Sequence, residues 1–92
     1  MIHVLVSSER PGLADALRAA APESTTFVSE SGVDATLERL SRSARIDGVV
    51  TDSPEIAEAI RDEIPGSLPV HVARADEPAK ETWAALLALI GD

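Results

Sequence analysis

The residues of this sequence best suited to chemistry include two histidines, each in an apolar run typical of a β-strand. His3 lies in the opening run MIHVLV, and His71 lies in the run LPVHVA. An imidazole can bind a metal ion or gain a proton near neutral pH, so the two could form a metal-binding or pH-sensitive pair. We expect their strands not to be neighbours in the sheet. We therefore interpret each histidine as a strand residue that hydrogen-bonds locally.

A polar run, Ser7-Ser8-Glu9-Arg10-Pro11-Gly12, follows the first apolar run and precedes a helical segment. The N-terminus of a helix offers backbone N–H groups to an anion, and Arg10 could assist in holding one. The run lacks the G-x-G-x-x-G and Walker patterns of phosphate-binding loops. We therefore interpret it as a plain turn.

Other catalytic patterns are missing from the sequence. There is no cysteine, which excludes disulfides, thiolate metal sites and cysteine nucleophiles. There is no H-E-x-x-H or comparable spacing of metal ligands, and no serine lies in a G-x-S-x-G elbow. The sequence predicts no catalytic residue, no metal site and no cofactor.

Short apolar runs alternate with segments of helical spacing along the chain. Ser31 and Asp34 form an S-x-x-D capping box for the second helical segment. Ser53 is a favourable cap for the third, with Pro54 at the first helical position. The predicted strands are residues 2–6, 25–28, 46–51 and 68–73, and the predicted helices are about residues 13–21, 33–44, 54–64 and 78–90.

This alternation predicts a parallel sheet, because strands joined through helices pair in parallel by right-handed crossovers. The most apolar runs, Val4–Val6 and Gly48–Val50, should lie inside the sheet, and the polar start of residues 25–28 indicates an edge strand. The predicted strand order is 2-1-3-4. The expected fold class is α/β: a three-layer α/β/α sandwich with a four-stranded parallel sheet, flavodoxin-like, with residues 1–92 as a single domain.

The charge balance limits the partners of this chain. The chain has sixteen acidic and eight basic residues, so its formal net charge is −8, and Lys80 is the single lysine. Such a surface repels nucleic-acid phosphates and anionic lipid, so a protein partner is expected and nucleic acid and membrane are not. We expect the acidic pairs Asp62-Glu63 and Asp76-Glu77 to lie on the solvated surface. Trp83, at helical spacing from apolar residues, is expected in the core and not in a binding site.

The same composition resembles that of halophile proteins, which tolerate many acids because molar salt shortens the Debye length to about 3 Å. The opening residues lack the basic start and long apolar run of a signal peptide, and no stretch approaches the roughly 20 apolar residues of a membrane span. We expect a cytoplasmic protein.

Four segments, taken in order, resemble a response-regulator receiver domain (CheY-like). These are VLVSSERPGLADAL (Val4–Leu17), SESGVDATLERL (Ser29–Leu40), IDGVVTD (Ile46–Asp52) and LPVHVARAD (Leu68–Asp76). The resemblance implies that Asp52, at the carboxyl end of a central strand, matches the phosphorylated aspartate of that family. Our preferred interpretation is that Asp52 is a vestigial phosphoacceptor that helps to begin the following helix.

The resemblance also shows what this sequence has replaced. The family binds Mg²⁺ with two acids at the end of the first strand, where this chain has Ser7 and Ser8, followed by Glu9. Phosphoryl transfer needs that ion to neutralise negative charge, and one remaining acid seldom makes a magnesium site. Ser7, Ser8 and Glu9 are therefore vestigial positions of an acidic pocket.

Two further family features are absent. The Ser or Thr that ends the family's fourth strand is replaced by Ala73-Arg74-Ala75. The Lys-Pro of its fifth strand has no counterpart, since Lys80 falls inside the last helix. The sequence thus predicts a degenerate, shortened receiver that is phosphorylation-incompetent and regulates a partner by protein–protein contact, through the Asp52 end of the sheet or the last helix. The alternatives are a minimal phosphoaccepting receiver that uses Asp52 and Glu9, and a self-associating structural module.

Overall fold

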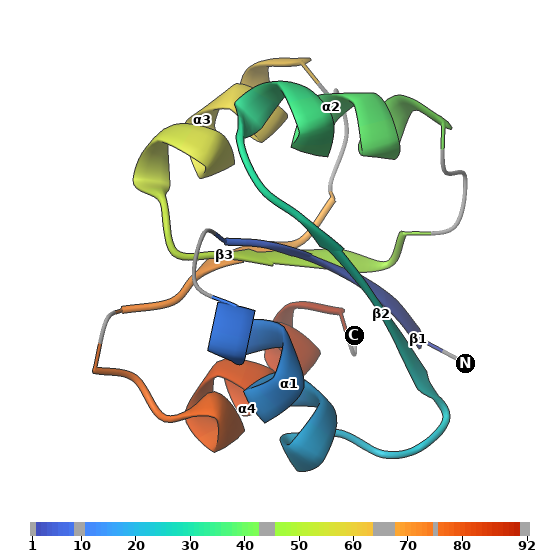
Figure 1. Ribbon diagram of the computed structural model, residues 1–92, viewed down its shortest axis with the longest axis vertical. Helices are drawn as coiled ribbons and strands as arrows, with labels where there is room; N and C mark the ends of the chain where they lie inside the picture. Colours follow the sequence, from blue (N-terminus) through green and yellow to red (C-terminus); the bar gives the residue numbers. More distant parts are fainter. Residues whose placement is uncertain (1, 9–10, 43–45, 64–67, 75, 91–92) are drawn as a thin grey trace.

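The computed structural model describes residues 2–8, 11–42, 46–63, 68–74 and 76–90. Strands and helices alternate along these residues, as the sequence predicts (Figure 1). The elements are β1 (Ile2–Ser7), α1 (Pro11–Ala20), β2 (Thr25–Glu30), α2 (Val33–Arg42), β3 (Gly48–Thr51), α3 (Pro54–Glu63), β4 (Val70–Val72) and α4 (Ala79–Ile90).

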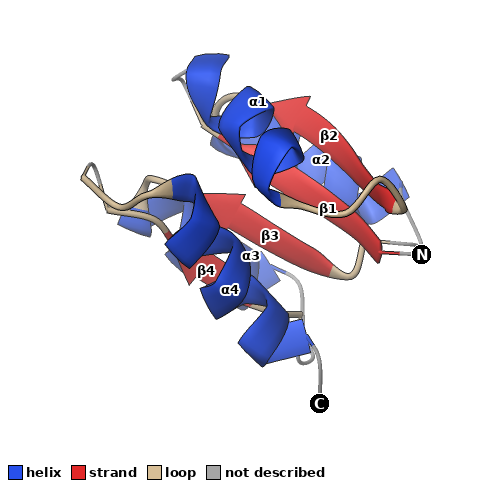
Figure 2. Cartoon of the chain, turned by 90° about the horizontal axis from the view of Figure 1, so that it is seen from below, coloured by secondary structure: helices blue, strands red, loops and turns tan. Residues whose placement is uncertain are grey.

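The four strands form one parallel sheet in the order β2-β1-β3-β4, which confirms the predicted order 2-1-3-4. β2 lies at one edge and the short β4 at the other (Figure 2). α1 and α4 cover one face, while α2 and α3 cover the other (Figure 1). The architecture is the predicted flavodoxin-like α/β sandwich.

Two of the predicted strands are shorter than expected. Residues 46–51 are predicted as one strand, but β3 begins at Gly48, because the Asp47 side chain takes the β1 N–H that a strand carbonyl would otherwise bind. The Asp47 N–H donates to the His3 carbonyl at 2.7 Å, and the His3 N–H donates to Asp47 Oδ2 at 2.8 Å. Residues 68–73 were also expected as a strand. β4 begins after Pro69, which has no N–H to donate to a ladder.

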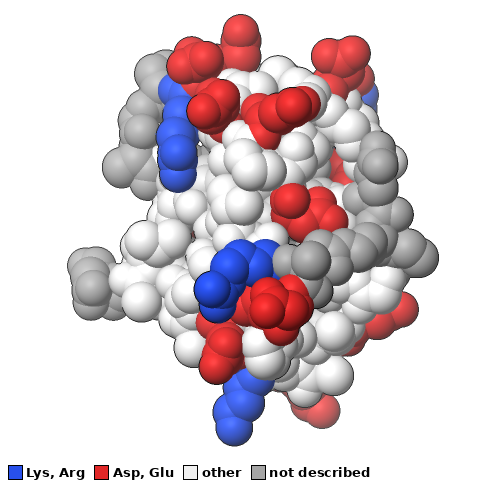
Figure 3. All heavy atoms as spheres, turned by 90° about the vertical axis from the view of Figure 1, so that its left-hand side faces the viewer, with Lys and Arg blue, Asp and Glu red and all other residues white. Residues whose placement is uncertain are grey.

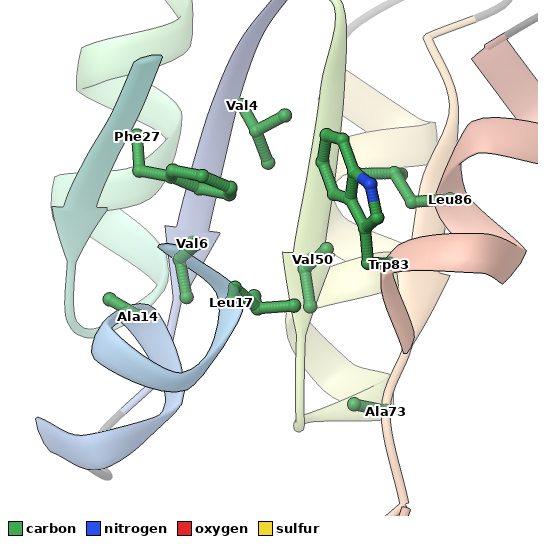
Figure 4. Close-up of a cluster of buried hydrophobic side chains, with 9 residues drawn as sticks. All are labelled: Val4, Val6, Ala14, Leu17, Phe27, Val50, Ala73, Trp83 and Leu86. Atoms are coloured by element: carbon green, nitrogen blue, oxygen red, sulfur yellow. The ribbon is translucent and has the colours of Figure 1, made fainter. Parts of the chain in front are cut away.

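The core is divided by the sheet because successive strand residues point to opposite faces. Val4 and Val6 face α1 and α4, whereas Leu5 faces α2 and α3, and all three are buried. On the α1/α4 side the rings of Phe27 and Trp83 lie 5.8 Å apart at 58° (Figure 4). Trp83 is only 6% exposed, so it is a core residue as predicted.

α4 packs tightly on β3 at Gly48. A Cβ atom on Gly48 would lie 2.7 Å from Cδ1 of Ile90 and 3.1 Å from Cδ1 of Leu86. Glycine thus lets the last turns of the helix approach the strand. Within the described ranges, no helix has the length and apolar character needed to cross a membrane.

Candidate functional site at the carboxyl edge of the sheet

The carboxyl ends of three neighbouring strands meet at one edge of the sheet. β2 ends at Glu30, β1 at Ser7 and β3 at Thr51, and Ser7 pairs in register with both of the others. Figure 3 views the molecule from this side, where acidic side chains are spread over the surface and lysine and arginine occupy isolated positions. In open parallel sheets this edge is the usual place for ligands.

Ser8 and Asp52 come together at this edge. The Ser8 hydroxyl donates to Asp52 Oδ2 at 3.0 Å, and both residues are partly buried. The Ser8 N–H also donates to the Glu30 carbonyl at 3.1 Å, which holds the residue beside β2. One hydrogen-bond partner of Asp52 is thus a neutral hydroxyl donor.

Ser7, predicted with Ser8 to be a vestigial position of the same acidic pocket, lies elsewhere. It is fully buried, and its Oγ lies 2.6 Å from Oγ1 of Thr36 in α2. The Thr36 hydroxyl donates its single proton to the Gly32 carbonyl at 2.7 Å, so Ser7 must be the donor to Thr36. Ser7 has the same strand parity as Leu5, which places it between the sheet and α2. Glu9, the third predicted position, lies outside the described residues.

The turn that carries Asp52 is fixed on both sides. The Ser53 N–H donates to Oγ1 of the buried Thr51 at 3.1 Å, and the Ala57 N–H donates to the Ser53 carbonyl at 3.2 Å. α3 begins at Pro54, as the sequence predicts. Asp52 is therefore held at the end of a central strand, directly before a helix.

The end of β4 supplies no hydroxyl to this site among the described residues. Ala73 is buried, with its N–H bound to the Thr51 carbonyl at 2.7 Å, and Arg74 is exposed. Ala75 lies outside the described residues. Lys80 lies in α4, as expected, and is exposed.

A second polar cluster, formed by His71, Glu77 and Thr82, joins β4 to the start of α4. Oε2 of Glu77 accepts from the Thr82 hydroxyl and lies 2.8 Å from Nε2 of His71. The Glu77 side chain is only 9% exposed. The prediction that the Asp76-Glu77 pair is solvated surface is therefore wrong for Glu77, although Asp76 and the Asp62-Glu63 pair are exposed. The error arose because the turn after β4 folds Glu77 back onto the strand, and this contact has no periodic signature.

The hydrogen bonds to Glu77 stabilise its charged form. The Thr82 hydrogen bond is the main cause that lowers the pKa of the Glu77 carboxyl below its ordinary value of 4.5, followed by the bond from His71. Desolvation by burial acts in the opposite direction, and the nearby charge of Arg74 adds a smaller lowering. An ionised carboxylate only accepts hydrogen bonds, so His71 carries a proton on Nε2.

The two histidines do not form a pair. β3 separates β1, which carries His3, from β4, which carries His71, and His71 hydrogen-bonds to Glu77, six residues along the chain. Of the run Ser7–Gly12, which the sequence analysis interprets as a plain turn, Glu9 and Arg10 lie outside the described residues, and α1 begins at Pro11.

The described residues contain no group of three or more His, Asp or Glu side chains placed to hold a metal ion. Among the described residues, the carboxyl edge carries Asp52, which accepts from a serine hydroxyl, and Glu30, which ends β2 and pairs with Arg39. No family model matches this chain, and no curated protein matches it either.

Proposed function

We propose that this chain is a receiver-like regulatory module that acts by protein–protein contact at the carboxyl edge of its sheet, without phosphoryl transfer. One observation carries the proposal: Ser8, at a position where the resembled family has a metal-binding acid, contributes a neutral hydroxyl to Asp52. A phosphoaccepting aspartate needs a divalent ion beside it, and Mg²⁺ is usually held by one or two carboxylates together with water and the substrate phosphate.

The surface chemistry supports a protein partner. The carboxyl edge is acidic (Figure 3), and the chain carries a net charge of −8. Such a surface attracts a basic protein surface and repels phosphate-rich polymers. The rigid turn at Thr51–Ser53 presents Asp52 without the cost of ordering a loop, which favours binding.

The second candidate is a minimal phosphoaccepting receiver. The position of Asp52 at the end of the central strand β3 favours it, because this is the ligand crevice of such sheets. The two candidates differ in one measurable product, an aspartyl phosphate. Incubation with a small phosphodonor and Mg²⁺, followed by intact mass measurement, should give no adduct for the module that we propose.

A Mg²⁺ titration followed by amide chemical shifts provides the matched control. We expect weak shifts, at millimolar or higher Mg²⁺, spread over surface acids and unchanged in Asp52→Asn. Ser8→Asp should create a second carboxylate beside Asp52 and tighten Mg²⁺ binding there. Ser7→Asp should not, because its carboxylate would lie between β1 and α2. A phosphoryl adduct that disappears in Asp52→Asn, or tight wild-type Mg²⁺ binding centred on Asp52, would refute the proposal.

A further inference from the structure

The two edges of the sheet differ in how well they are protected from pairing with another strand. β4 has three residues and follows Pro69, and Arg74 is exposed just beyond it. Short length, proline and charge are the features that blunt an edge strand. β2 has six residues and pairs with β1 in continuous register, without a bulge. Its first five residues, Thr-Thr-Phe-Val-Ser, include no charge, proline or glycine.

The hydrogen bonds between β1 and β2 show which main-chain groups of β2 point away from the sheet. The Glu30 carbonyl accepts from the Ser8 N–H, so Glu30 points its main-chain groups toward β1. Main-chain polar groups alternate in direction along a strand, so Val28 and Thr26 also point toward β1, and Phe27 and Ser29 point outward. Within the described part of the chain, no hydrogen bond reaches the outward groups of Phe27 and Ser29, and no strand lies beyond β2 (Figure 2).

The surface beside this edge has balanced charge. An open depression between β2 and α2 is lined by what we call the Glu/Arg patch: Glu30, Ala35, Glu38, Arg39 and Arg42. Arg39 Nε donates to Glu30 Oε2 at 2.7 Å, and Arg42 pairs with Glu38. The patch holds two acids and two bases, so the excess of eight acids over bases in the whole chain lies outside it.

We propose that β2 is a self-association edge, on which a second copy of this chain pairs antiparallel to form a continuous eight-stranded sheet. A second copy repels this molecule over most of its surface and least at the neutral Glu/Arg patch, where each Glu can also meet an Arg of the other copy. A two-fold axis at Phe27 pairs the outward groups of Phe27 with those of its counterpart, and Ser29 with Thr25. It also places the two Glu30 carboxylates at opposite ends of the interface.

This pairing provides about four main-chain hydrogen bonds. Two join the Phe27 residues, and one at each end runs from the Ser29 N–H to the Thr25 carbonyl. The Thr25 N–H is already bound to the Pro22 carbonyl at 3.0 Å, which removes one donor at each end. The dimer should therefore be modest in affinity and sensitive to salt.

The salt dependence can be calculated from the net charge. Two copies of this chain, each of charge −8 and with centres about 25 Å apart, still repel each other at about 0.1 M salt, where the Debye length is about 10 Å. At about 1 M salt the repulsion is screened, so the dissociation constant should fall about fivefold. Sedimentation equilibrium from micromolar to millimolar protein at both KCl concentrations measures this change.

Ser29→Pro is the discriminating variant. The substitution removes an outward N–H and breaks no hydrogen bond to β1. The Ser29 side chain is exposed, so a proline ring at this position has room. Ser29→Ala is the matched control, since it keeps the N–H. We expect Ser29→Pro to stay monomeric and Ser29→Ala to dimerise as the wild type does. A wild type that is monomeric at millimolar concentration in about 1 M KCl, or a dimer that persists in a folded Ser29→Pro, overturns the proposal.

Amide hydrogen exchange of the wild type gives a second readout that does not depend on the variants folding. On dimerisation, exchange at Phe27 and Ser29 should slow as protein concentration rises. Exchange at Thr26 and Val28, which face β1, should not change with concentration. Exchange at Phe27 and Ser29 that is independent of concentration would refute pairing at this edge, whatever mass is measured.

Discussion

Replacing Glu77 with glutamine should destabilise the fold, although the sequence places this residue in an apparently ordinary acidic pair. The carboxylate accepts from Thr82 and His71 and is 9% exposed. Hydrogen bonds to a charged group contribute about 1.5–3 kcal/mol each when buried. Several features reduce the loss here. Glutamine keeps one acceptor oxygen, Thr82 has a second acceptor in the Pro78 carbonyl at 3.3 Å, and His71 is partly exposed. We expect a loss of about 1–2 kcal/mol at pH 7.

The pH dependence of this loss follows from the pKa of Glu77. That pKa is lowered in the folded protein by the Thr82 and His71 hydrogen bonds, from an ordinary value of 4.5. A lowered pKa means that the unfolded chain binds the proton more readily, so the contribution to stability is fully present above pH 4.5. It is lost as the pH falls below that value through the folded pKa. The difference between wild type and Glu77→Gln should therefore be constant near neutral pH and shrink in acid.

Urea unfolding at pH 7 and at a series of acidic pH values measures this difference. Glu81→Gln is the matched control, because it removes the same charge from an exposed position in α4, the helix that follows Glu77. It should change stability by less than about 0.5 kcal/mol. Equal effects of the two substitutions at neutral pH would refute the reasoning, as would a Glu77→Gln deficit that persists undiminished in strong acid. Nitrogen-15 spectra showing the His71 proton on Nδ1 would refute the assigned donor.

Three further predictions concern stability. Gly48→Ala should cost about 1–2 kcal/mol in urea unfolding, because its Cβ would lie 2.7 Å from Cδ1 of Ile90. A Cβ on Gly12 would meet nothing within 4 Å, so Gly12→Ala should be neutral or stabilising. Equal effects of the two substitutions would contradict the close packing of α4 on β3. Asp47→Ala should lower the urea midpoint by less than Gly48→Ala does. Asp47→Asn should recover part of that loss, because it keeps an acceptor for the His3 N–H. An Asn variant with a urea midpoint as low as that of the Ala variant would argue against this bond. The melting temperature should rise by several degrees from dilute buffer to about 1 M KCl, because eight excess negative charges repel one another; a flat profile would remove the argument for a halophilic protein.

The sequence was sufficient to predict the sheet because burial and strand order depend on the same pattern. Val4–Val6 and Gly48–Val50 are apolar on both faces, which is possible only for strands covered by helices on both sides, and both lie inside. Thr25 and Thr26 begin the strand with polar side chains, and that strand lies at the edge. The short connections then leave few ways to arrange four parallel strands.

The strand ends could not be predicted from this pattern, because they depend on single hydrogen bonds. Asp47 lies in an apolar-flanked run but uses its carboxylate to bind His3. The same limit explains Ser7 and Ser8. Both residues are serines, so the sequence does not distinguish them. Their positions at the end of β1 decide that the Ser7 hydroxyl faces Thr36 in α2 and the Ser8 hydroxyl faces Asp52.

The two proposed surfaces together constrain how the protein would engage a partner. An antiparallel pairing of β2 with its counterpart reverses the direction of the second sheet, so the carboxyl edges of the two copies face opposite ends of the dimer. One partner molecule could not bridge both Ser8–Asp52 sites across a single flat face. The dimer would instead bind two partner molecules independently. Each dimer would then carry two partners, and dimerisation would not raise the affinity for either of them. Because Glu30 lies at the end of β2 and accepts the Ser8 N–H, pairing at Phe27 would also order the strand that supports the candidate site.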